Sequence, residues 1–222
     1  MLAASAALLG LLLRNEPLHA VTATVKAGRT LRALLSQQGF VVAVIAGVCS
    51  YGVMTLIMTA TPLSMHIADD HSLEATGWVI TSHIGAMYAP SLFSGFLIVR
   101  FGCRLIMIAG VITMSLSLML GLQGQAVTHY WLSLVALGVG WNFLYVGDTT
   151  LLTRYYWPEE RFKAQAFNEF CVFGVAALAS LASGAALHYL GWRWLLIVPM
   201  PVLLLVVFGF LTLYPEARQK PT

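Results

Sequence analysis

Long apolar stretches separated by short polar segments dominate this chain. Six stretches have the roughly 20 mostly apolar residues that a helix needs to cross a bilayer. They run over residues 40–61, 78–99, 105–122, 130–152, 164–187 and 192–214. Some connections are only about five residues long, which allows only antiparallel neighbouring helices. The pattern therefore predicts an all-α membrane protein with six transmembrane helices.

The first 13 residues are also apolar, but they are too short to span a bilayer alone and lack the basic start of a secretory signal. We interpret residues 1–13 as a partial transmembrane helix that begins upstream. Residues 14–39 contain Arg, Lys, Thr and Gln and no long apolar run, and we interpret them as a cytoplasmic linker. The six-helix transmembrane domain would then occupy residues 40–214, followed by a cytoplasmic tail over residues 215–222.

The composition excludes most water-soluble classes of protein. Only 9% of the residues are charged and 59% are hydrophobic, whereas about a quarter of a soluble domain is charged. Cys49, Cys103 and Cys171 lack the spacing of metal ligands, so we expect packed or free thiols and no metal. We found no zinc-protease motif, no nucleophile-elbow motif and no pair of intramembrane aspartates. We therefore expect no enzyme activity and no cofactor.

The distribution of basic residues predicts the orientation in the membrane. If six helices alternate, 11 of the 12 Lys and Arg residues fall on one side, and Arg193 alone falls on the other. The positive-inside rule makes the first side cytoplasmic. We expect a multi-pass protein of the cell (inner) membrane, with both ends of the six-helix unit cytoplasmic. The basic residues form no contiguous patch, so no nucleic-acid partner is expected.

The chain contains the segments GFLIVRFGCR, RYYWPEER and GAALHYLGWRW. They resemble motifs of the Major Facilitator Superfamily of transporters. Residues 95–104, GFLIVRFGCR, resemble the family signature between its second and third helices, which recurs in weaker form between its eighth and ninth. Residues 184–194, GAALHYLGWRW, resemble the junction of its eleventh and twelfth helices. Residues 154–161, RYYWPEER, resemble the loop between its tenth and eleventh helices. In this order the motifs span most of the chain.

The signature-like segment has a physical rationale. Gly95 would let two helices approach closely, and Gly102 would allow a tight reversal of the chain. Val99 and Cys103 depart from the family pattern, which has an acidic and a basic residue at these positions.

The resemblance implies the C-terminal half of such a transporter. The family builds each half from two inverted three-helix repeats and binds substrate near the midplane between the halves. Residues 1–13 would then be the tail of the family's helix six. The implied function is secondary active transport of a small organic molecule by alternating access, with protons as the candidate coupling ion. The chain would need a missing N-terminal half or a second copy as partner; the alternative is a truncated, non-transporting membrane protein.

Polar and aromatic residues recur along residues 130–152 at steps of three and four, so they are expected to share one helix face. Such a face is costly against lipid, and the resemblance places this helix beside the central cavity. The candidate substrate contacts are Asn142, Trp141, Tyr145, Tyr51 and Tyr88. An aromatic site with few charges favours neutral or weakly cationic organic compounds. The alternative is that the aromatic rings only pack and that Asn142 bonds across helices.

Charged groups in or beside the apolar stretches are candidates for coupling or gating. Asp148 lies six residues before Arg154, where it could bind a proton or form a gate salt bridge with an arginine of the signature-like turn. Glu169 has the same two interpretations, with Arg154 or Lys163 as its partner. His83 could couple to protons because imidazole titrates near neutral pH, although simple packing against another helix is the simpler interpretation. The coupling or gate candidates are Asp148, Glu169, His83, Arg100, Arg104 and Arg154.

Overall fold

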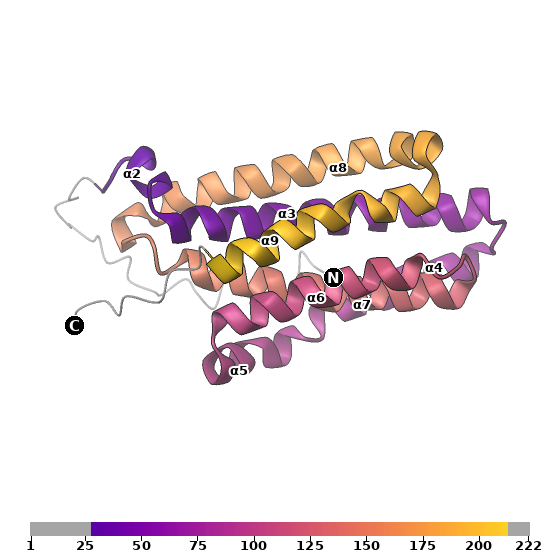
Figure 1. Cartoon of the computed structure of the whole chain (residues 1–222), viewed down its shortest axis with the longest axis horizontal. Helices are drawn as coiled ribbons and strands as arrows, with labels where there is room; N and C mark the ends of the chain where they lie inside the picture. The colour runs from indigo at the N-terminus through magenta and orange to yellow at the C-terminus, as the bar shows by residue number, and fades with distance from the viewer. Residues whose placement is uncertain (1–27, 213–222) are drawn as a thin grey trace, which may run out of the picture.

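The computed structural model describes residues 28–212 as an elongated bundle of helices (Figure 1). The α-helices are α2 (Leu31–Leu35), α3 (Gln38–Pro62), α4 (Leu73–Tyr88), α5 (Ser91–Phe101), α6 (Cys103–Gly121), α7 (Val127–Leu152), α8 (Arg161–Ile197) and α9 (Pro199–Thr212). A π-helix, Leu63–Ala68, continues α3, and a 3-10 turn, Pro158–Glu160, precedes α8. The expected partial helix, most of the expected linker and the expected tail lie outside the described residues.

Five helical segments of the described chain are long and apolar enough to cross a membrane. The fifth runs from Pro158 to Thr212 and contains 55 residues. Gly191 interrupts it with φ 76° and ψ 167°, a backbone conformation that glycine adopts without strain. The chain reverses there, so that α9 runs back along the bundle (Figure 1). The prediction of an all-α membrane protein is therefore confirmed, although residues 28–212 hold five such segments rather than six, and the last of them is broken at Gly191.

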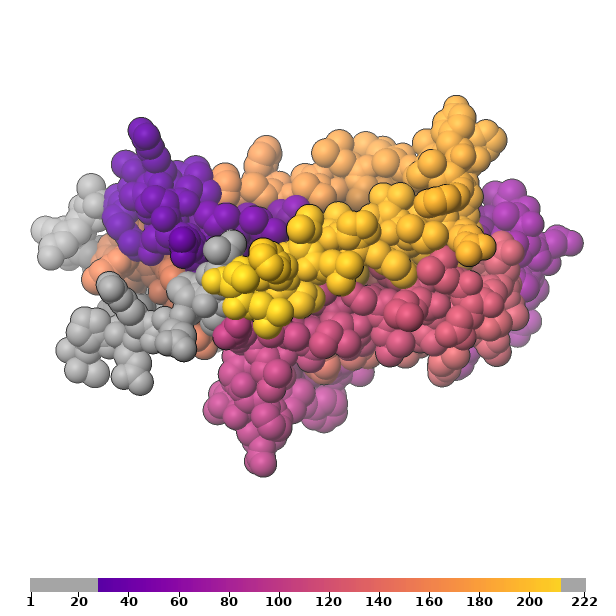
Figure 2. All heavy atoms as spheres, viewed as in Figure 1, coloured from indigo at the N-terminus to yellow at the C-terminus, as the bar shows by residue number. Residues whose placement is uncertain are grey.

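The second expected helix is divided near its middle. α4 ends at Tyr88 and α5 begins at Ser91, because Pro90 has no N–H to donate and its ring disturbs the preceding turn. Asn142 of α7 donates from Nδ2 to the Met87 carbonyl at 2.8 Å and to Ser91 Oγ at 2.6 Å. These two hydrogen bonds satisfy the Met87 carbonyl and the Ser91 hydroxyl at the break between α4 and α5. Beyond it α5 diverges from the bundle and projects from its surface (Figure 2).

α3 and α7 form the centre of the bundle. α7 packs against α3, α4 and α6, while α8 packs against α3 and α9 packs against α3 and α6. In the most apolar stretch of the α3 span and of the α7 span, 56% of the residues are buried. In the corresponding stretch of the α4–α5 span, only 17% are buried. Large apolar side chains therefore face outward from α4, α5 and α8, as lipid or a packed partner would allow.

α6 and α7 approach each other where glycines face backbone atoms. A Cβ on Gly110 would lie 2.8 Å from the backbone nitrogen of Leu144, and a Cβ on Gly140 would lie 2.7 Å from that of Met114. By contrast, a Cβ on Gly95 would have no neighbour within 4 Å. The close contact expected at Gly95 is therefore wrong, because α5 diverges from its neighbours. Gly102 does form the expected reversal, with φ 84°.

One end of the bundle joins segments that are far apart in sequence. Arg29 donates from Nε and from Nη2 to the two carboxylate oxygens of Glu160, at 2.8 Å each. These hydrogen bonds raise the pKa of the Arg29 guanidinium above its ordinary value. Arg104 donates from Nη2 to the Leu211 carbonyl at 3.0 Å. The start of α3, the α5–α6 turn, the α7–α8 loop and the end of α9 thus lie at one end.

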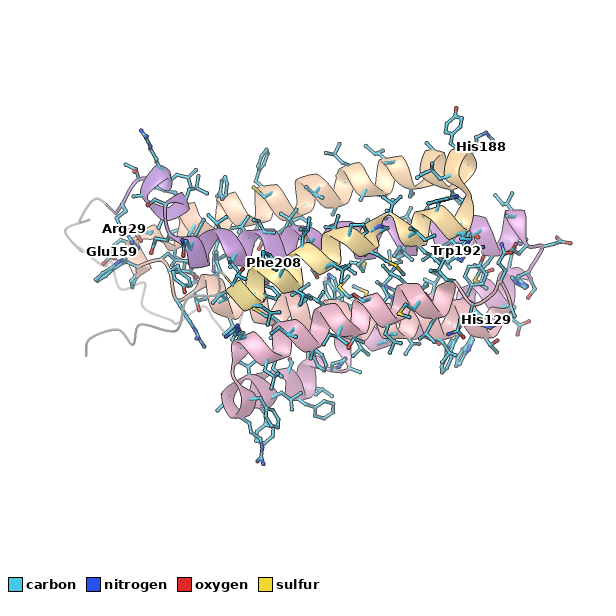
Figure 3. The ribbon with its side chains drawn as sticks, in the orientation of Figure 1. Arg29, His129, Glu159, His188, Trp192 and Phe208 are labelled. Atoms are coloured by element: carbon cyan, nitrogen blue, oxygen red, sulfur yellow. The ribbon has the colours of Figure 1, made fainter. Side chains whose placement is uncertain are left out.

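The opposite end has its own polar network. The Tyr130 hydroxyl donates to Asp69 at 2.6 Å, and Gln125 donates to the other carboxylate oxygen at 2.9 Å. The ring of Tyr130 packs against Trp192, with centroids 4.8 Å apart. Figure 3 places Trp192 and His129 at this end and Arg29 and Glu159 at the other. The helix ends therefore fall into two groups, as expected if successive helices cross the membrane in alternating directions.

Candidate solute-binding site

Five aromatic side chains from four helices form a group that we call the aromatic cluster. Its members are Tyr51, Tyr88, Trp141, Tyr145 and Phe173. Trp141 and Tyr145 lie one turn apart on α7 and stack with centroids 5.1 Å apart and planes 9° apart. Tyr51 of α3 meets both rings edge-on, at 5.1 and 5.4 Å. Tyr88 of α4 and Phe173 of α8 extend the cluster on its two sides. Four of the five were predicted as substrate contacts.

The aromatic cluster has a buried base and an exposed rim. Trp141 is only 3% exposed, whereas Tyr88 is 62% and Phe173 is 53% exposed. Aromatic rings arranged in this way can stack on a flat apolar solute, while the tyrosine hydroxyls can orient it through hydrogen bonds.

Two cavities in the described chain lie away from the aromatic cluster. A cavity of about 480 Å³ between α3 and α8 is lined by apolar side chains such as Val48 and Leu178. Another, of about 370 Å³, lies beside the break at Gly191 in α8 and includes Arg193. We favour the aromatic cluster because it combines stacking surfaces with hydroxyl and carboxyl groups, which neither cavity does.

Asn142 does not join the aromatic cluster, although it follows Trp141 directly. It is 1% exposed and is bonded to Met87 and Ser91 at the α4–α5 break. Successive residues of a helix point about 100° apart, so Asn142 is directed to the α4–α5 break while Trp141 contacts the rings of Tyr51 and Tyr88. The expected single polar face of α7 is therefore two faces. The geometry matches the interpretation that Asn142 bonds across helices.

Asp148 lies beside the aromatic cluster, where α7 meets α3 and α8. Its side chain is 3% exposed, and Oδ1 has no hydrogen-bond partner among the described residues. A Cβ on Gly47 of α3 would overlap Oδ2. Glu169 of α8 is near enough to interact electrostatically with Asp148, Tyr51 and Tyr145. The structure thus brings both candidate carboxylates to the same junction.

The candidate gate arginines lie away from this junction. The ion pair within residues 28–212 joins Arg29 to Glu160, so neither Asp148 nor Glu169 forms one with Arg100, Arg104 or Arg154 in this conformation. The Arg100 guanidinium lies 5.5 Å from the ring centroid of Phe101. Arg104 is bonded to the end of α9. A gate salt bridge from Asp148 would need a different conformation.

His83 is fully buried between α4 and α7. Its Nδ1 lies 2.7 Å from the Leu134 carbonyl oxygen, so Nδ1 carries the hydrogen. Nε2 has no hydrogen-bond partner in the described part of the chain. The ring therefore packs against the neighbouring helix, as the simpler interpretation expected.

The sequence interpretation did not identify Phe173 or the contact between Gly47 and Asp148. Phe173 follows Glu169 by four residues, so both lie on one face of α8. This four-residue spacing was the signal in the sequence that could have identified Phe173. The contact of Gly47 depends on the register between α3 and α7, for which a single sequence gives no signal.

Known proteins resemble this chain over most of its length. The family model of the Major Facilitator Superfamily matches residues 43–222. Over 180 residues the chain is 41% identical to "Riboflavin transporter RfnT" of Brucella anthropi, a match that covers 81% of this chain and 45% of that protein. Over 187 residues it is 33% identical to "Uncharacterized MFS-type transporter YddS" of Bacillus subtilis, covering 79% and 42% of the two chains.

A third relative is "Puromycin resistance protein pur8" of Streptomyces alboniger, which is 33% identical over 133 residues, covering 60% of this chain and 26% of that protein. The chain thus spans less than half the length of these relatives. The extent of the family match and the identity to the first two relatives agree with the helical bundle. This chain belongs to the Major Facilitator Superfamily.

Proposed function

We propose that this chain is the C-terminal half of a secondary carrier that moves a flat heteroaromatic molecule, such as riboflavin, across the membrane. The aromatic cluster is the observation that carries this proposal. Flavin rings have two broad faces that can stack on aromatic side chains, and such stacking contributes about 1–3 kcal/mol per ring in comparable nucleobase sites. The 41% identity to a protein named as a riboflavin transporter supports the same solute.

We also propose that the chain crosses the membrane six times, as two inverted three-helix repeats. A single straight helix of 55 residues would be about 80 Å long, more than twice the ~30 Å core of a bilayer. The break at Gly191 supports two crossings in its place. The end that holds Arg29 and Arg104 would face the cytoplasm, because most basic residues belong to it.

The exposed apolar surface supports the proposal that this chain is one half of a carrier. Tyr88 and Phe173 stand at the open rim of the aromatic cluster, next to apolar side chains of α4, α5 and α8 that face outward. An N-terminal half, or a second copy, would cover this rim and enclose the solute between the two halves. A non-transporting fragment is the alternative, and it predicts no uptake with or without a partner.

Proton coupling would act through Asp148. A buried carboxylate with an unpartnered oxygen, such as Oδ1 of Asp148, is costly in its charged form, so proton binding is favoured while the junction is closed. Opening the junction would admit water and favour release. Glu169 would assist, because its negative charge disfavours a second charge beside it.

Equilibrium binding tests the solute assignment. The chain in lipid nanodiscs is titrated with riboflavin, alone and after co-expression with the unmatched N-terminal part of the RfnT relative, while tryptophan fluorescence is recorded. Ribitol, which lacks the flavin ring, is the control. We expect saturable quenching by riboflavin and none by ribitol. Quenching that is absent in both preparations, or equal for the two compounds, would contradict the proposal.

A further inference from the structure

We infer that Gly47 is a positioning residue, because the space left by its missing side chain holds the carboxylate of Asp148. We call this space the Gly47 socket. Its existence follows from geometry alone, while its consequence for transport rests on the proposed proton-coupled function.

The contacts around Gly47 define the socket. A Cβ there would overlap Asp148 Oδ2 and would lie 3.1 Å from Cγ2 of Val172. α7 thus supplies the carboxylate, α3 supplies the space, and α8 closes the junction. Among the described glycines, Gly47 is the one whose Cβ position is taken by a carboxylate oxygen.

Because the Gly47 socket is buried, the Asp148 carboxylate has little room to move within it. Asp148 is 3% exposed and Gly47 is buried as well, so the carboxylate cannot move aside into solvent without opening the junction. Protein interiors are closely packed and respond to the addition of one methyl group. An alanine at position 47 must therefore displace the carboxylate or separate α3 from α7.

The groups around the socket connect it to the aromatic cluster. The titratable groups that face Asp148 are Glu169 on α8, Tyr145 on α7 and, through both of these, Tyr51 on α3. Tyr51 lies one turn after Gly47 on the same helix. Neutralising Asp148 removes its repulsion of Glu169, so proton binding would favour a closer approach of α7 and α8. The socket would thus join proton binding to movement of the solute site.

Infrared difference spectroscopy across a pH titration detects the protonated carboxyl group directly. We expect a carboxylic-acid band in the unmodified chain that Asp148→Asn removes. Gly47→Ala should shift the midpoint of this band by at least about one pH unit, a tenfold change in proton affinity. The matched control is Gly52→Ala on the same helix, where a Cβ would meet only Cγ1 of Val175 at 3.0 Å. It should leave the midpoint unchanged.

A double variant covers the case in which Gly47→Ala does not fold. Gly47→Ala combined with Asp148→Ala removes the overlap with Oδ2 and leaves only the 3.1 Å approach to Cγ2 of Val172. Its melting temperature should therefore differ from that of Asp148→Ala no more than Gly52→Ala differs from the unmodified chain. The inference is overturned if this recovery fails, if Gly47→Ala has the same midpoint as Gly52→Ala, or if the unmodified chain shows no Asp148 band. Riboflavin does not enter these measurements. Failure of riboflavin binding with the band intact would overturn the proposed function and leave the socket in place.

Discussion

Trp141→Ala should weaken riboflavin binding about 10- to 100-fold, which corresponds to the loss of about 1–3 kcal/mol of stacking. Trp141 is the buried base of the aromatic cluster and contacts the rings of Tyr51, Tyr88 and Tyr145. Its removal takes away the largest aromatic surface and leaves the neighbouring rings free to move. The fluorescence of bound flavin during titration measures the affinity, since this signal does not depend on the deleted tryptophan.

Trp194→Ala is the control for this substitution. Trp194 follows the break at Gly191 in α8, at the opposite end of the bundle from the α7–α8 loop, and is 57% exposed. Its loss should leave riboflavin affinity unchanged within about twofold. Equal weakening by the two substitutions would show that binding does not depend on the aromatic cluster.

Gly140→Val should destabilise the folded chain by at least about 1–3 kcal/mol, the usual cost of overpacking. The new side chain would meet the backbone nitrogen of Met114 at 2.7 Å and the carbonyl oxygen of Gly110 at 2.8 Å. Backbone atoms of a paired helix cannot move aside as a flexible side chain can, so α6 and α7 must separate. A lower melting temperature in detergent measures the effect.

Gly174→Val provides the comparison within the same protein. It also places valine in a helix, but a Cβ at position 174 has no neighbour within 4 Å. The two substitutions therefore share the same change in helix propensity and differ in packing. Similar melting temperatures for both variants would mean that α6 and α7 do not approach as closely as the structure indicates.

Much of the fold could be predicted from the sequence because bilayer thickness fixes the length of a crossing. The stretches expected at 105–122 and 130–152 agree with α6 and α7 within a few residues. The division of α4 from α5 was not predicted, although Pro90 is visible in the sequence. A proline can kink a helix or end it, and the acceptors at this break are satisfied by Asn142, a residue of another helix.

The site was predictable where one helix face determines it. Trp141 and Tyr145 are four residues apart and therefore share a face, on which Tyr51 and Tyr88 meet Trp141 from other helices. Asn142 was wrongly placed on this face, because depth in the membrane does not determine the direction of a side chain.

The partners of charged groups were less predictable for a related reason. Asp148 lies at the depth expected for a gate, yet its side chain contacts Gly47 rather than an arginine. Arg104 is directed to the end of α9. Such pairings depend on the rotation and register of packed helices, and these are set by contacts between distant residues.

Riboflavin uptake into sealed vesicles is the most direct test of the proposed carrier half. The chain is reconstituted alone and together with the unmatched N-terminal part of the RfnT relative, and an inward or outward proton gradient is imposed. We expect accumulation only when both parts are present, with a dependence on the gradient that Asp148→Asn abolishes. Proton-driven uptake by this chain alone as a monomer, or no uptake by the reconstituted pair although it binds riboflavin, would contradict this account.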